Sequence, residues 1–182
     1  MIENTDSTTE RDYIKTVFAA VFTIYFFRCA HNPAEAMFLH NVNLPIHETG
    51  HLLFRPFGEF VMIAGGSLFQ IIVPLVFCGY FIYNEKPFSA SMVLFWVGES
   101  LCDVYVYAAD AQVMQLLLTS GMTGSEGGFH DWNYLLTAMN SLNNTKPIAN
   151  LIRFIGVVLM IFATIGSLLY ATKNERIFTD IE

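Results

Sequence analysis

Three residues of the sequence His47-Glu48-Thr49-Gly50-His51 have the types and the spacing of a metal-dependent hydrolytic site. On a helix, positions four apart lie on one face, so His47 and His51 can offer two imidazole nitrogens to one metal ion. Glu48 follows the first histidine, where its carboxylate can reach a water bound to that metal. Zinc lowers the pKa of such a water towards ~7, and the carboxylate then takes its proton as the oxygen attacks a carbonyl carbon. The motif therefore predicts a Zn²⁺ site with Glu48 as general base.

Two prolines flank the helix that must carry this motif. Pro45 suits a first helical position, and Pro56 stops or kinks the pattern after Phe54 and Arg55. We therefore expect a helical segment over residues 45–55. The alternative interpretation is a helix that carries two hydrogen-bonded histidines and binds no metal.

The composition is that of an integral membrane protein. Of the 182 residues, 54% are apolar and 15% aromatic, only 14% are charged, and the mean hydropathy is +0.46. The charged fraction is well below the usual quarter of a soluble domain. A net charge of −7 argues against a nucleic-acid partner. Three cysteines in or beside apolar stretches are interpreted as small buried hydrophobes: Cys29, Cys78 and Cys102.

Apolar stretches predict an all-α, polytopic membrane helix bundle with about four spans. A single membrane domain is expected over residues 13–172, with a disordered polar tail at 1–12 and a C-terminal tail at 173–182. Residues 31–59 are too polar for a clean span, so the segment that carries HExxH is expected to be kinked or re-entrant. The four predicted spans are Tyr13–Ala30, Phe60–Tyr83, Phe88–Leu118 and Pro147–Thr172.

The distribution of basic residues favours this topology over one in which the motif segment also spans. With four spans and a cytoplasmic N-terminus, five cations fall on the inner side, as the positive-inside rule prefers: Arg11, Lys15, Lys86, Lys173 and Arg176. The chain is therefore expected to be a multi-pass integral protein of the cell (inner) membrane.

The stretch Phe88–Leu118 is hydrophobic at helical length yet carries Glu99, Asp103 and Asp110. Each ionised carboxylate near the bilayer centre costs ~2.5–3.5 kcal/mol, and no Lys or Arg occurs anywhere from residue 87 to 145. The acids must therefore face a wet cavity, be protonated, face a metal, or pair with a distant arginine (Arg28, Arg55 or Arg153).

A Gly-rich loop at residues 120–128 leads to a short amphipathic helix. Asp131 is predicted to be its N-cap, and the helix to run through Met139. His130 follows the loop and is the only histidine after the motif, so it is a candidate third metal ligand. A plain loop histidine is the alternative.

The motif and the small residues after it resemble the site-2 protease group of membrane zinc metalloproteases. The resemblance is specific at the motif and continues into Ala64-Gly65-Gly66 and Gln70, since a similar small-residue and amide pattern follows the motif in that group. It covers roughly residues 40–110. It implies zinc held by His47 and His51, Glu48 as general base, and hydrolysis of a peptide bond in or near the membrane.

The third ligand of that group is an aspartate in an Asn-x-x-Pro-x-x-x-Leu-Asp-Gly motif, which this chain lacks. Asp103 and Asp110 lie on the corresponding predicted helix without those flanking residues. Three residues therefore stay open as the third ligand: His130, Asp110 and Asp103. His130 is favoured, because a neutral imidazole beside the carboxylate of Asp131 combines a common ligand with its usual hydrogen-bond partner.

Three functions are compatible with these features. The first is a zinc-dependent membrane-embedded endopeptidase acting on a membrane protein or peptide substrate within the lipid bilayer. The second is a non-enzymatic membrane subunit or assembly partner that keeps a structural metal site, which implies partners in a membrane complex. The third is a haem or quinone protein that uses His40, His47 or His51 as ligands.

Overall fold

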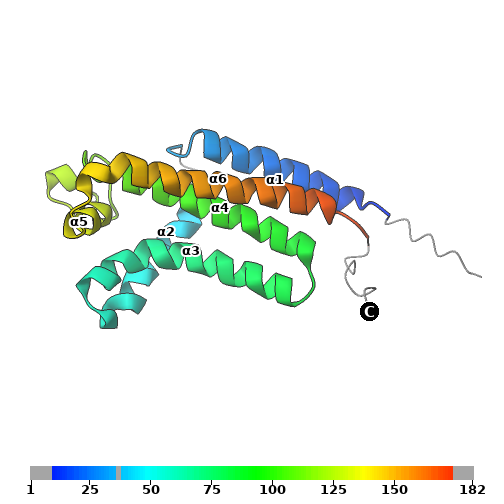
Figure 1. Ribbon diagram of the computed structural model, residues 1–182, viewed down its shortest axis with the longest axis horizontal. Helices are drawn as coiled ribbons and strands as arrows, with labels where there is room; N and C mark the ends of the chain where they lie inside the picture. The colour runs from blue at the N-terminus through cyan, green and yellow to red at the C-terminus, as the bar shows by residue number, and fades with distance from the viewer. Residues whose placement is uncertain (1–9, 36–37, 174–182) are drawn as a thin grey trace, which may run out of the picture.

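The computed structural model describes residues 10–35 and 38–173, and within them the regular elements are helices joined by turns and loops (Figure 1). Short 3₁₀ turns η1 (Arg55–Phe57), η2 (Gly124–Glu126) and η3 (Leu142–Asn144) connect some of them. The chain is an all-α helix bundle, as predicted. Its α-helices are α1 (Tyr13–His31), α2 (Phe38–Phe54), α3 (Glu59–Tyr83), α4 (Pro87–Ala109), α5 (Asp131–Ala138) and α6 (Thr145–Leu169).

Four of these helices are long and apolar enough to cross a membrane: α1, α3, α4 and a stretch over Leu142–Leu169 that includes α6. They correspond to the four apolar stretches of the sequence. The third stretch is shorter than predicted, because α4 ends at Ala109 and not at Leu118. Asp110 ends it by turning the chain: its carboxylate accepts the backbone N–H groups of Gln115 and Leu116 at 3.0 and 2.9 Å.

The motif helix is longer than the sequence indicated. α2 begins at Phe38, so the prediction that Pro45 stands at the first helical position is wrong, and Pro45 lies inside the helix. A proline there leaves the carbonyl of Asn41 without its helical N–H partner, which interrupts the hydrogen-bond ladder shortly before His47. The end of the helix was predicted well, since Pro56 falls in η1 directly after Phe54.

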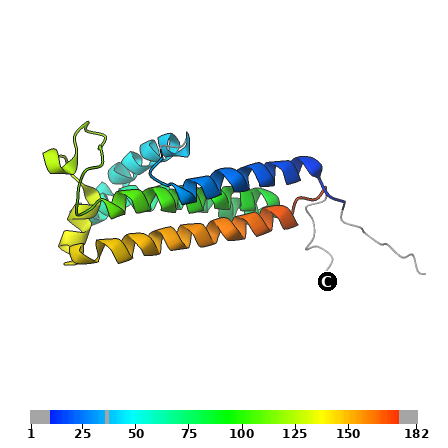
Figure 2. The same ribbon diagram turned by 90° about the horizontal axis from the view of Figure 1, so that it is seen from above.

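Helix α4 is the central element and packs against α1, α3 and α6. It approaches α6 closely at Gly98 and Gly156, where a Cβ on either glycine would lie 2.7 Å from the carbonyl oxygen of the other. The beginning of α1, the α3–α4 turn and the end of α6 lie at one end of the bundle, and α2 and α5 lie towards the other (Figures 1 and 2).

The two ends of the described chain meet. Arg11 and Thr172 form an isolated antiparallel bridge, and the Asp12 N–H donates to the carbonyl of Ala171 at 3.0 Å. Asp12 also caps α1 with its side chain. The predicted disordered tail therefore does not extend to residues 10–12, whereas its first nine residues, and residues 174–182 of the predicted C-terminal tail, lie outside the described residues.

The interior at the centre of the bundle is aromatic. Phe26 of α1 stacks on Phe95 of α4 with ring centroids 5.1 Å apart, and Met160 of α6 is fully buried beside them. Large apolar side chains also cover the outside of α1, α3 and α6, among them Val21, Val76 and Phe162. An apolar exterior around an apolar interior suits a lipid environment better than water.

Candidate metal centre

Glycines let the motif helix approach α3 very closely. A Cβ at Gly50 would collide with the carbonyl group of Gly65, and one at Gly65 would collide with the side chain of Phe54. At Gly66 a Cβ would lie 2.5 Å from His47 Nε2 and 2.6 Å from His51 Nε2. The small residues noted in the sequence thus make room for the two imidazoles.

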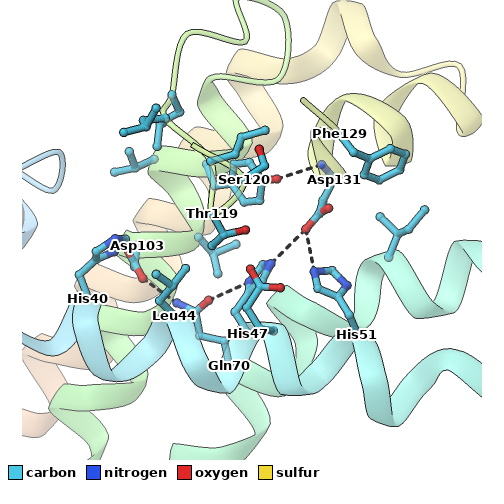
Figure 3. A pocket seen from close by; sticks show the side chains of 18 of the residues that line it. His40, Leu44, His47, His51, Gln70, Asp103, Thr119, Ser120, Phe129 and Asp131 are labelled. Carbon is cyan, nitrogen blue, oxygen red and sulfur yellow. Dashed lines mark hydrogen bonds and ion pairs between the residues drawn. The ribbon is translucent and has the colours of Figure 1, made fainter. Parts of the chain in front are cut away.

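His47, His51 and Asp131 converge on one point (Figure 3). The Asp131 Oδ2 atom lies 3.0 Å from His47 Nε2 and 3.1 Å from His51 Nε2. His47 and Asp131 are buried, and the His51 side chain is about one-fifth exposed. Within the described part of the chain, this is the one group of three His, Cys, Asp or Glu side chains whose potential ligand atoms lie within 4.8 Å of one another.

Asp131 reaches the motif because it is not the N-cap of α5. The cap is His130, whose Nδ1 accepts the N–H of Asn133 at 3.2 Å, and Asp131 is the first residue of the helix. Three bonds anchor this helix end: the Asp131 N–H donates to Tyr107 Oη at 3.0 Å, the Trp132 indole to Ser67 Oγ at 3.1 Å, and the Asn133 amide to Ala111 O at 2.8 Å. The Asp131 carboxylate is therefore not used to cap the helix, and its position beside the motif histidines is fixed.

The three residues considered as third ligand in the sequence lie elsewhere. The His130 imidazole is buried and its Nε2 lies 3.3 Å from Asp110 Oδ2, while Asp110 also holds the loop that follows α4. Asp103 contacts His40 and Gln70 instead of the motif histidines. The preference for His130 is thus not supported by the geometry. The sequence signal for Asp131 was present, an acid next to that histidine, but the capping role assigned to it concealed it.

The outer nitrogens of both imidazoles have their protonation set by oxygen atoms that can only accept. His51 Nδ1 lies 3.0 Å from the carbonyl oxygen of Met62, and His47 Nδ1 lies 3.1 Å from Gln70 Oε1. Each Nδ1 must therefore carry a hydrogen, which leaves the lone pair of a neutral ring on Nε2. Two lone pairs then face a carboxylate oxygen, and this arrangement is repulsive unless positive charge lies between them.

A proton on Nε2 supplies such positive charge, and the pKa values of the cluster reflect this protonated state. The hydrogen bond that the His51 ring donates to the Asp131 carboxylate raises the pKa of His51 above its usual value, although burial of the ring works in the opposite direction. Burial raises the pKa of Asp131, but the hydrogen bonds from His47 and His51 outweigh it and hold that pKa below the usual range. The cluster thus favours a charged carboxylate with positive charge beside it, a condition that a metal cation fulfils.

A cavity of about 460 Å³ opens beside the cluster, and Glu48 lies in its wall with an exposed side chain. Apolar side chains make up much of the remaining wall: Leu44, Met62, Ile63, Val104, Leu116, Leu117, Leu118 and Phe129. A volume of this size is typical of small-ligand sites. The cavity therefore places a carboxylate base, a candidate metal position and an apolar binding surface next to one another.

The acids of α4 contact polar side chains of α2 and α3, and not the distant arginines considered in the sequence. Asn43 Nδ2 donates to Glu99 Oε2 at 2.8 Å, and Gln70 Nε2 donates to Asp103 Oδ2 at 2.8 Å. Arg153 instead donates to the carbonyl of Ala30 at 2.7 Å. Sequence reasoning missed Asn43 and His40 as partners, because both precede the predicted motif helix.

No protein-family model, curated protein or solved structure matches the chain. The resemblance to site-2 proteases therefore rests on the motif and on the residues that follow it.

Proposed function

We propose that the chain is a zinc-dependent endopeptidase of the cell membrane that hydrolyses peptide bonds in or near the bilayer. The observation that carries this proposal is the convergence of His47 Nε2, His51 Nε2 and Asp131 Oδ2 beside an exposed Glu48. Two imidazoles and one carboxylate on a tetrahedral ion leave one position open, which is the usual coordination of a catalytic zinc.

The protein side chains would divide the reaction between them. A zinc ion held by His47, His51 and Asp131 would act as a Lewis acid, lowering the pKa of the attacking water and polarising the scissile carbonyl. Glu48 takes the proton of that water as its oxygen adds to the carbonyl carbon, and then delivers the proton to the departing amine nitrogen. In total, one water and one amide give one carboxylic acid and one amine.

The cavity indicates the form of the substrate. In a helix, the backbone carbonyl groups are hydrogen-bonded within the chain, so a membrane helix must unwind locally before Glu48 and the metal can reach a peptide bond. The leucine and phenylalanine side chains of the cavity wall can contact apolar residues of such an unwound segment. We therefore expect an apolar transmembrane or juxtamembrane peptide as substrate.

Metal content is the first test of the proposal. We expect one zinc per chain in detergent-purified protein and its loss in the His51→Ala variant, measured by elemental analysis for zinc, iron and manganese together. Iron in place of zinc would contradict the hydrolytic mechanism, because two histidines and one carboxylate also form the iron site of oxygenases.

Removing the base tests the chemistry separately from the metal. The Glu48→Gln variant should keep its zinc and lose turnover by about 10²–10⁴-fold, the usual contribution of a general base. Turnover is measured by mass spectrometry on a library of apolar peptides in lipid vesicles. Undiminished cleavage in this variant would sink the mechanism. Zinc in the wild-type protein without cleavage of any library member would favour the structural metal site of a membrane subunit.

A further inference from the structure

A chain of hydrogen bonds leads from His47 of the His47, His51 and Asp131 cluster to His40, a third histidine in the wall of the same cavity (Figure 3). His47 Nδ1 lies 3.1 Å from Gln70 Oε1, Gln70 Nε2 lies 2.8 Å from Asp103 Oδ2, and Asp103 Oδ1 lies 2.7 Å from His40 Nδ1. The four side chains come from α2, α3 and α4. Gln70 is buried, and His40 at the outer end has a side chain that is 42% exposed.

Asp103 determines which group donates and which accepts in these hydrogen bonds. An ionised carboxylate accepts hydrogen bonds and cannot donate them. The Gln70 amide must therefore turn its NH₂ group to Asp103, and this leaves its oxygen facing His47. An amide oxygen can only accept, so the proton of His47 is held on Nδ1 and its lone pair on Nε2, the atom that faces Asp131 and His51.

We propose that Gln70 and Asp103 are positioning residues of the metal site: Asp103 orients the Gln70 amide, and the amide keeps His47 in the tautomer that binds a cation through Nε2. The inference deepens the proposed function by assigning a task to an acid on α4 that the hydrolytic chemistry does not use. Residues that hydrogen-bond to a metal ligand in this way typically contribute about 10–100-fold to metal affinity.

Asp103 is itself held from two further sides. His40 Nδ1 donates to its other oxygen, and Asn43 Nδ2 lies 3.4 Å from Oδ2. Asn43 is fully buried and also contacts Glu99 and the Trp96 indole. The hydrogen-bonded side chains His47, Gln70, Asp103 and His40, here called the relay, are therefore anchored to a buried polar network. This network keeps the oxygen and the nitrogen of the Gln70 amide from exchanging places.

A reciprocal exchange of the two side chains tests the direction of the relay. Gln70→Glu alone places two carboxylates against each other, and we expect zinc affinity to fall by about 10–100-fold. Asp103→Asn added to that variant restores one donor and one acceptor at the contact with almost unchanged shape. The double variant should return to within about threefold of wild-type affinity. Zinc affinity is measured by competition with a chromophoric chelator, and Gln112→Leu, at a glutamine that contacts the carbonyl of Leu142, is the matched control.

The tautomer is read directly by NMR on histidine-labelled protein, which has only five histidines to assign. We expect a slowly exchanging Nδ1 proton on His47 in the metal-free wild type and in the metal-free double exchange variant, and its loss in metal-free Gln70→Leu, where no zinc ion on Nε2 fixes the tautomer. Additive losses of affinity in the double variant, or an Nδ1 proton on His47 that persists in Gln70→Leu, would overturn the inference.

These readouts separate the inference from the proposed function. A protein that binds zinc but cleaves no peptide would leave the relay intact and remove only the protease activity. If the wild type bound no zinc, the same NMR comparison in the metal-free protein would still decide the tautomer, and a wild-type His47 protonated on Nε2 alone would refute the relay.

Discussion

At the scale of single residues, Asp131 is the candidate third ligand, because its Oδ2 atom lies 3.0 and 3.1 Å from the Nε2 atoms of the two motif histidines. Replacing it with asparagine removes the charge but hardly alters the shape. We expect Asp131→Asn to lower zinc affinity by more than about 100-fold. Removing a residue that only hydrogen-bonds to a metal ligand already lowers metal affinity by about 10–100-fold. The measurement is the same chelator competition, made on folded protein as judged by its thermal unfolding.

The control is the neighbouring histidine. His130→Asn removes the imidazole but keeps a good N-cap for α5, and asparagine is among the best residues for that position. Its zinc affinity should stay within about threefold of wild type, because His130 faces Asp110 and not the cluster. A loss in His130→Asn as large as that in Asp131→Asn would restore His130 as the third ligand.

At the scale of elements, composition alone predicts the long helices, because a stretch of 18 or more predominantly apolar residues is typical of a membrane-spanning helix. The motif fixes His47, Glu48 and His51 through helical spacing, which is a local property. The start of α2 was not predictable from the sequence. Pro45 is typical of the first position of a helix, but packing against α3 stabilises a helix that begins earlier, at Phe38. The pairing of Asp131 with the motif is also non-local: it depends on how Tyr107 and Ser67 hold α5.

Helix α3 provides space for the site at a glycine. Gly66 leaves the room that the two imidazoles occupy, and a methyl group there would lie 2.5–2.6 Å from both Nε2 atoms. We expect Gly66→Ala to displace at least one imidazole and to lower zinc affinity by more than about tenfold, a loss in the range found when ligand orientation is disturbed. Elemental analysis of the purified variant would show substoichiometric zinc.

Gly79 provides the matched control on the same helix. A Cβ at Gly79 meets nothing within 4 Å, and alanine favours a helix over glycine by about 1 kcal/mol. Gly79→Ala should therefore keep full zinc and be as stable as wild type or more stable. Full zinc binding in Gly66→Ala would show that the imidazoles do not need this space.

At the scale of the whole molecule, the four long helices determine on which side of a membrane the site opens. If α1, α3, α4 and α6 each cross and α2 does not, the start of α1 and the α3–α4 turn share one side, and α2 and α5 share the other (Figure 2). Arg11, Lys15, Lys86 and Lys173 all belong to the first side, which the positive-inside rule assigns to the cytoplasm. The cavity beside the motif would then open towards the outer side.

Single cysteines report this topology, because the three native thiols are buried. In intact cells, a membrane-impermeant maleimide should label Thr137→Cys on α5 and should spare Tyr13→Cys and Asn84→Cys, three positions that are exposed in the structure. After the membrane is opened, all three should react, which controls for thiol reactivity. Labelling of Tyr13→Cys and Asn84→Cys from opposite sides would mean that α2 also crosses. The His47 and His51 imidazoles would then lie within the bilayer and not at its outer side, and the substrate bond would have to be sought at that depth.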